Sequence, residues 1–228
     1  MSAAGGTISM LIGAVLLRLT FTGTYSRYVR VGMGPWLAVA GIAVFLLGLA
    51  TLLRALRRPD TADADVHDHG ADRVGWLLLA PIAALLLVAP PTLGSYGVGR
   101  GATVDVRAGA PVFDDLRAGR EPIPMTLLEF GQRAFERDGA SFNGAEVELT
   151  GFVAQTQGDG FELARYQIAC CAADATPVVI RVTDVFGDAP PQDGWVTVTG
   201  VFQPGGEPIP RLAATTVLAI TPPNDPYE

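Results

Sequence analysis

The sequence predicts an α+β membrane protein with about three N-terminal transmembrane helices, followed by a small OB-like five-stranded β-barrel domain. Two observations support this class. The long apolar segments lie before Arg100, whereas the acidic residues lie after Pro59. From Asn143 onward, apolar and polar residues alternate with a period of two, which is typical of half-buried β-strands. The net charge of −7 also argues against a nucleic-acid partner, because a phosphate-binding surface needs clustered cations.

The transmembrane region is expected to occupy residues 1–99. Residues 31–53 and 74–96 contain no charged side chain, and each segment is long enough to cross a bilayer, which takes about 20 apolar residues. Residues 7–25 form an additional expected span, although Arg18 lies within it and an Arg at the bilayer centre costs roughly 3 kcal/mol. Arg18 would therefore reach toward the interface or face a partner helix. A cleaved signal peptide is the alternative interpretation of the N-terminus.

The distribution of arginines predicts the orientation of the chain. Arg54, Arg57 and Arg58 follow the second span, and positive residues favour the cytoplasmic side of a membrane. With three spans, the C-terminal domain of a multi-pass cell-membrane protein would then be extracytoplasmic. Arg27 and Arg30 lie on the opposite side and weaken this assignment.

An acidic loop, residues 59–73, is expected between the second and third spans. His67 and His69 flank Asp68 in this loop, and imidazole together with carboxylate can bind a divalent cation. Two histidines separated by one residue are only a fragment of such a site. The alternative, which the composition favours, is a solvated acidic linker.

A linker over residues 100–123 is expected to lead into the OB-like domain, residues 124–228. Its first element would be a short amphipathic helix over residues 124–137, with Thr126 as a cap. Alternation and turn residues then predict five strands, over residues 143–153, 161–171, 177–183, 195–202 and 211–220. Gly151 marks a bend within the first strand, and a long, bent first strand is typical of an OB barrel.

The second predicted strand changes the face on which its apolar residues lie. Phe161 and Leu163 share one face, whereas Tyr166 and Ile168 have the opposite parity. Because neighbouring residues of a regular strand point to opposite faces, this change predicts a bulge near residues 164–165.

The two cysteines of the chain, Cys170 and Cys171, are adjacent, so they cannot close the long loop through which a disulfide usually stabilises a domain. After the predicted bulge, Cys170 would point inward and Cys171 outward. Three functional interpretations compete with a pair of buried cysteines that pack as small apolar residues. The thiols could bind a soft metal ion, or they could form a strained, easily reduced vicinal disulfide. Cys171 could also be a nucleophile whose pKa is lowered by Arg165, but this half of the chain contains no histidine to act as its base.

Several short motifs lie in order along most of the chain. They comprise Tyr28, Val29, Gly32, Met33, Pro35 and Trp36; the His67-Asp68-His69 loop; Pro90, Pro91, Leu93, Gly94 and Ser95; Gly151, Phe152 and Val153; Leu163, Ala164, Arg165 and Tyr166; Cys170, Cys171, Ala172, Ala173, Asp174 and Ala175; and Trp195, Val196, Val198 and Gly200. With these motifs the chain resembles a bacterial family of permease small subunits, the YcgQ-like proteins. The resemblance implies a larger multi-span permease partner of the YcgR-like kind. Arg165 and Asp174 carry over as motif positions without an assigned role.

The expected function is therefore that of an accessory subunit of a membrane permease, whose extracytoplasmic β domain carries the vicinal cysteines. The alternative is a membrane-anchored metal-binding or thiol redox-sensing protein that acts without a permease. The candidate metal ligands are Cys170, Cys171, His67 and His69, and the candidate cofactor is a divalent or soft metal ion. The expected partners are the permease and the lipid bilayer. An enzyme is not expected, since no Ser/His/Asp set, phosphate-binding loop or HExxH motif is found.

Overall fold

The computed structural model describes residues 3–57, 93–100, 103–106, 112–158, 160–206 and 208–228. The chain divides into two compact units, Met1–Pro91 and Thr92–Glu228. The predicted acidic loop, with His67 and His69, and most of the predicted span over residues 74–96 lie outside the described residues.

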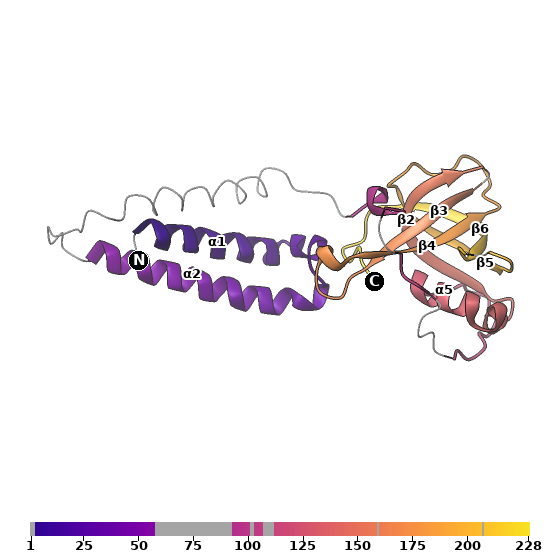
Figure 1. Cartoon of the computed structure of the whole chain (residues 1–228), viewed down its shortest axis with the longest axis horizontal. Helices are drawn as coiled ribbons and strands as arrows, with labels where there is room; N and C mark the ends of the chain where they lie inside the picture. The colour runs from indigo at the N-terminus through magenta and orange to yellow at the C-terminus, as the bar shows by residue number, and fades with distance from the viewer. Residues whose placement is uncertain (1–2, 58–92, 101–102, 107–111, 159, 207) are drawn as a thin grey trace. The chain divides into compact units, whose positions relative to one another are not determined.

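The N-terminal unit contains two helices that lie side by side, α1 (Ala3–Phe21) and α2 (Gly34–Arg57), with two short 3-10 helices between them, η1 (Thr24–Arg27) and η2 (Val31–Met33) (Figure 1). Glycines allow the two backbones to approach closely. A Cβ atom at Gly48 would lie 2.5 Å from the Met10 backbone nitrogen, and one at Gly13 would lie 2.5 Å from the Phe45 nitrogen. Small residues are typical of such contacts between apolar helices.

Two of the three predicted spans, over residues 7–25 and 31–53, lie in the described part of the chain, and there one helix, Val31–Arg57, is long and apolar enough to cross a membrane. The prediction is therefore wrong for the first span. Gly5–Phe21 is a shorter apolar helix. Its apolar stretch ends early because Arg18 lies in its last turn, so its apolar length falls short of the roughly 30 Å of a hydrocarbon core. The single candidate is compatible with a membrane anchor or with a signal sequence.

The C-terminal unit is a mixed α+β domain built on one six-stranded sheet. Its elements are η3 (Ser95–Gly97), β1 (Ile123–Pro124), α5 (Leu127–Phe135), η4 (Glu136–Phe142), β2 (Glu146–Gln157), β3 (Gly160–Gln167), η5 (Ala172–Asp174), β4 (Thr176–Thr183), β5 (Trp195–Gln203) and β6 (Arg211–Ile220). The strand order is β1-β2-β3-β4-β6-β5, and β2 also pairs with β5. The prediction of five strands is corrected to six, because the two residues of β1 are too few to show an alternating pattern.

The bend predicted at Gly151 falls where β2 passes from one neighbour to another. β2 pairs with β5 from Glu146 to Phe152, and with β3 from Phe152 onward. A Cβ atom at Gly151 would lie 2.7 Å from the Ala164 carbonyl oxygen, so a larger residue would push β3 away. The register shift of β2 lies between Val153 and Gln155.

The predicted bulge near residues 164–165 is wrong. β3 pairs with β4 in one continuous register, from Phe161 opposite Val182 to Gln167 opposite Thr176. The apolar residues change parity because β3 is covered on both faces. Phe161 and Leu163 lie in the main core, whereas Ala164, Tyr166 and Ile168 lie in a second buried cluster with Phe152, Trp195 and Tyr227.

The predicted helix is shorter than expected but begins as expected. Thr126 caps α5, since its side-chain oxygen accepts a hydrogen bond from the Glu129 N–H at 3.0 Å. The helix ends at Phe135, because Arg137 and Asp138 adopt left-handed backbone angles. Phe130 on its inner face is fully buried in the main core.

Candidate functional site

The cysteine pair lies in a loop between β3 and β4, after the last residue of β3. Cys170 is exposed and Cys171 is partly exposed, and both are free thiols. The predicted inward orientation of Cys170 is therefore wrong, as is the alternative of two buried cysteines. The physical reason is that β3 ends at Gln167, so that strand parity no longer governs where these side chains point.

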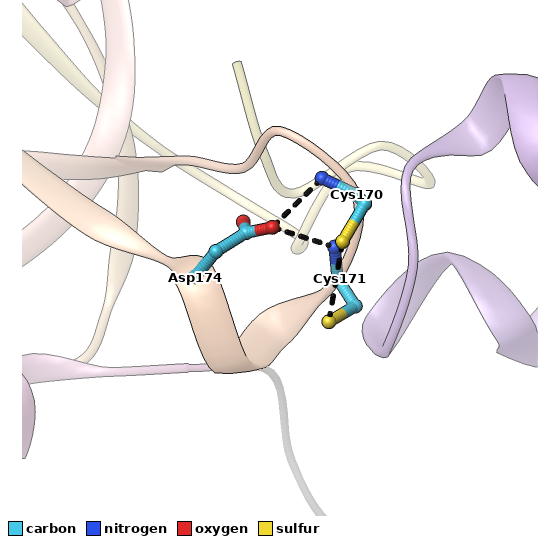
Figure 2. Close-up of side chains that lie close together, drawn as sticks. All are labelled: Cys170, Cys171 and Asp174. Atoms are coloured by element: carbon cyan, nitrogen blue, oxygen red, sulfur yellow. Dashed lines mark hydrogen bonds between the residues drawn. The ribbon is translucent and has the colours of Figure 1, made fainter.

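The carboxylate of Asp174 holds the backbone of this loop. One oxygen, Oδ1, accepts a hydrogen bond from the Ala169 N–H at 2.9 Å. The other, Oδ2, accepts from the N–H groups of Cys170 at 2.9 Å and Cys171 at 3.3 Å (Figure 2). Because these three consecutive N–H groups bind the Asp174 side chain, they cannot form hydrogen bonds with a neighbouring strand, which explains why β3 ends before the cysteines.

The two thiols face one another on the surface of the domain. Their sulfur atoms are 3.6 Å apart. The interaction of the thiol with the nearby Asp174 carboxylate, with a smaller contribution from Cys171, raises the pKa of Cys170 to about 12. The interaction with the same thiol is the main cause that lowers the pKa of Asp174 to about 2, followed by the backbone hydrogen bonds that the carboxylate accepts. At neutral pH, Cys170 is therefore a protonated thiol beside an ionised carboxylate.

This protonation state bears on the chemistry of the pair. A nucleophilic cysteine needs a lowered pKa, so the raised pKa of Cys170 disfavours this thiol as a nucleophile. The nucleophile predicted from the sequence was Cys171, and that role stays a prediction. A metal ion, in contrast, displaces thiol protons as it binds. Within the described part of the chain, Cys170, Cys171 and Asp174 form a group whose ligand atoms all lie within 4.8 Å of one another. Thiolate sulfur and carboxylate oxygen together suit borderline or soft divalent ions.

Arg165, the other motif position, binds the C-terminal tail. Its Nη2 group donates to the carbonyl oxygens of Asp225 at 2.8 Å and Tyr227 at 3.2 Å, and its guanidinium lies 4.0 Å from the Glu228 carboxylate. These contacts assign Arg165 a structural role. The sequence interpretation had instead considered it as a group that would activate Cys171.

The C-terminal tail was not singled out from the sequence, yet it supports the strand that leads into the cysteine loop. The Glu228 N–H donates to the Tyr166 carbonyl at 2.9 Å, and the Ile168 N–H donates to the Glu228 carbonyl at 3.3 Å. The Glu228 side chain is 3% exposed and accepts hydrogen bonds from the N–H groups of Leu127 and Leu128, at the start of α5. Burial raises the pKa of Glu228. A signal existed only in Tyr227, an aromatic residue near the end of an otherwise polar tail.

Of the predicted metal ligands, the structure brings Cys170 and Cys171 together and adds Asp174 to them. His67 and His69 lie outside the described residues, so their predicted role stays a prediction.

The comparisons with known proteins agree with the resemblance for the C-terminal part of the chain. Residues 133–228 match the family described as the DUF1980 C-terminal domain, which covers the long strands, the cysteine loop and the tail. No curated protein matches the chain. The C-terminal domain is thus similar, at a coarse level, to the DUF1980 or YcgQ-like proteins.

Proposed function

We propose that this protein is a membrane-anchored binder of a thiophilic metal ion, which its C-terminal domain holds through Cys170 and Cys171. The observation that carries the proposal is the pair of free, surface-accessible thiols with sulfur atoms 3.6 Å apart. Both can ligate one ion without rearrangement of the backbone, because Asp174 fixes the N–H groups of both cysteines. Such preorganisation lowers the entropic cost of bringing two ligands together.

The experiment is a titration of the full-length chain, purified in detergent under a reducing agent that does not bind metals, with Cd²⁺. The sulfur-to-metal charge-transfer absorption reports Cd–thiolate bonds. We expect the wild-type chain to develop this band, Cys170→Ser and Cys171→Ser to bind far more weakly, and the double variant to show no band. Asp188→Asn serves as the matched control, because Asp188 is exposed, lies outside the cysteine loop and loses one negative charge in the variant. A wild-type chain without the band, or a double variant that keeps it, would refute the proposal.

The proposed membrane anchor is the α1–α2 pair, in which α1 enters the bilayer together with α2. The glycine contacts support this arrangement, since they join the two helices along their length. Arg18 lies three residues before the end of α1, where its side chain can reach the interface. The exposed side chains of α2 include Trp36, Leu47 and Leu56, at 68–72% exposure, which suits contact with lipid or with another membrane protein.

The proposed arrangement of the β domain is an OB-like barrel. Its support is that the long strand β2 pairs with β5 along its first half and with β3 along its second half. A first strand that takes part in both halves of the wall is typical of this fold, which presents binding loops at its surface. The fold itself does not specify a ligand.

The accessory-subunit role is a second proposal, which adds a permease partner to the metal-binding domain. It rests on the resemblance and on the large apolar side chains that α2 leaves exposed. Co-expression with a multi-span permease of the YcgR-like kind, followed by purification in mild detergent, tests it. A stable complex supports the proposal. Elution of the chain by itself, under conditions in which both proteins are intact, contradicts the role without affecting the metal-binding proposal.

A further inference from the structure

We infer that the cysteine loop is an open, three-ligand site, which holds one exchangeable divalent ion per chain between Cys170, Cys171 and Asp174 in a bent, tetrahedral geometry. The inference rests on the proposed metal binding and specifies its coordination and its mode of release. It contrasts with a closed four-sulfur site shared by two chains, and with linear coordination of a monovalent ion.

The sulfur separation indicates a bent geometry. With metal–sulfur bonds of about 2.3 Å, two sulfur atoms 3.6 Å apart subtend an angle of roughly 100° at the ion. This value lies close to the tetrahedral angle. A linear ion with bonds of the same length would need the sulfur atoms about 4.6 Å apart, and therefore a reorientation of both side chains.

Asp174 has room for the ion beside the hydrogen bonds that it accepts from the backbone. A carboxylate offers about four acceptor positions. Three are occupied by the N–H groups of Ala169, Cys170 and Cys171, so one position is left. A divalent ion bound by the two sulfur atoms would lie within reach of this position, because the ligand atoms of Cys170, Cys171 and Asp174 all lie within 4.8 Å of one another. Binding is balanced as two thiols plus one divalent ion giving a dithiolate complex and two released protons.

The number of ligands makes the site open. In the part of the chain that the structure describes, the group contains two sulfur ligands and one carboxylate, one fewer than a closed tetrahedral site needs. Cys170 is exposed, so solvent reaches the group. The fourth position is thus accessible to water or to a ligand of an acceptor, and an acceptor can bind the ion before the chain releases it.

The test uses the full-length chain in detergent, with Co²⁺ and Cd²⁺ as probes. We expect one ion per chain, a tetrahedral Co²⁺ spectrum, and two sulfur neighbours of Cd²⁺ by X-ray absorption. Removal of Cd²⁺ by an excess of a small chelator should accelerate in proportion to the chelator concentration, as a direct attack on an open position requires. Asp174→Asn should weaken Cd²⁺ binding roughly 10- to 100-fold with both sulfur ligands retained, Asp174→Glu should recover part of the loss, and Asp188→Asn should have no effect.

Several results separate this inference from the proposed function. One ion per two chains with four sulfur neighbours would overturn the open site while leaving metal binding intact. Linear two-coordinate binding, or chelator-independent release, would do the same. Tighter binding of arsenite than of Cd²⁺ would overturn the inference that the site holds a divalent metal ion. Failure of the wild-type chain to bind any of these ions would refute the proposed function, and this inference with it.

Discussion

The replacement Asp174→Asn tests directly whether the Asp174 carboxylate controls the reactivity of Cys170. The substitution removes a negative charge beside the thiol and replaces one carboxylate oxygen with an amide NH2 group. That group cannot accept the two N–H bonds now received by Oδ2 from Cys170 and Cys171. The thiol therefore loses the interaction that most strongly favours its protonated form.

The magnitude follows from the pKa of Cys170. The Asp174 carboxylate makes the largest contribution to raising this pKa from 9.0 to about 12. Removal of the carboxylate charge should therefore let the pKa of Cys170 fall toward its ordinary value. Below the pKa, each unit changes the thiolate fraction about tenfold. Cys170 is exposed and a more acidic thiolate is a weaker nucleophile, so the increase in reactivity is smaller than the full shift implies. We expect Cys170 to be alkylated at least about tenfold faster in the variant.

The assay is the rate of iodoacetamide modification at pH 8, followed by mass spectrometry of the full-length chain in detergent. A Cys171→Ser background isolates the Cys170 thiol, so that each measured rate belongs to one sulfur atom. Asp188→Asn in the same background controls for the loss of one negative charge elsewhere on the domain. Equal alkylation rates before and after the Asp174→Asn replacement would show that the carboxylate does not govern the thiol, and the proposed site geometry would then be wrong.

Three further substitutions test the scaffold. Gly48→Ala should destabilise the α1–α2 pair by about 1–3 kcal/mol in thermal melts in detergent, because the added methyl group would clash with backbone atoms of α1. Gly32→Ala is the control, since Gly32 has open space around its Cα atom and the substitution should not destabilise the pair. Equal melting points of the two variants would contradict the close packing. Phe130→Ala should lower the unfolding free energy of the domain by about 3–5 kcal/mol, because Phe130 is fully buried. Phe186 is 89% exposed, so Phe186→Ala should lower the unfolding free energy by less than about 0.5 kcal/mol. Similar losses in the two variants would contradict the core assignment. Burial raises the pKa of Glu228, so its favourable contribution is fully present below the ordinary pKa of 4.5 and is lost as pH rises through the raised pKa. The unfolding free energy of the wild type relative to Glu228→Gln should therefore fall as pH rises in urea titrations, and a rise would refute the assignment.

The strand predictions succeeded where the evidence in the sequence is local. The predicted strand over residues 211–220 coincides with β6, and the one over residues 177–183 differs from β4 by one residue. Alternation of apolar and polar residues, bounded by turn residues, suffices to locate such strands. β3 was overextended to Cys171, since Ile168 and Cys170 continue the alternation after the chain has left the sheet. The competing interaction, the carboxylate of Asp174, is a side chain beyond the strand, and its backbone bonds leave no hydrophobic pattern.

The change of parity in β3 was observed correctly and explained wrongly. A sequence shows which residues are apolar but not whether a strand has one covered face or two. The second face of β3 is covered by residues from distant parts of the chain, including Leu93, Trp195 and Tyr227. Because none of them is close to β3 in sequence, the local pattern could be explained only by a bulge.

The candidate site was identified only in part from the sequence. The adjacent cysteines were recognised as the distinctive feature, and the resemblance singled out Asp174 and Arg165 as motif positions. The hydrogen bonds of Asp174 to three N–H groups, and the use of Arg165 to hold the tail, depend on the path of the loop. The span predicted over residues 7–25 was overestimated, because the apolar helix Gly5–Phe21 is shorter than the apolar segment suggested. The span predicted over residues 74–96 lies mostly outside the described residues and stays a prediction.

The structural role of Arg165 connects the scaffold to the chemistry of the site. Arg165 secures the tail, and the tail provides the carbonyl of Glu228 that accepts the Ile168 N–H, two residues before Cys170. Ile168 itself is buried, so the chain enters the loop from a fixed point. At the other end, Asp174 lies two residues before the start of β4 and draws the N–H groups of the cysteines toward itself. A flexible surface loop would have to order two thiols against their conformational entropy each time an ion bound. With both ends fixed, the folding of the domain has already restricted the loop, so the two sulfur atoms can be solvent-accessible and still remain at the distance that a single ion requires.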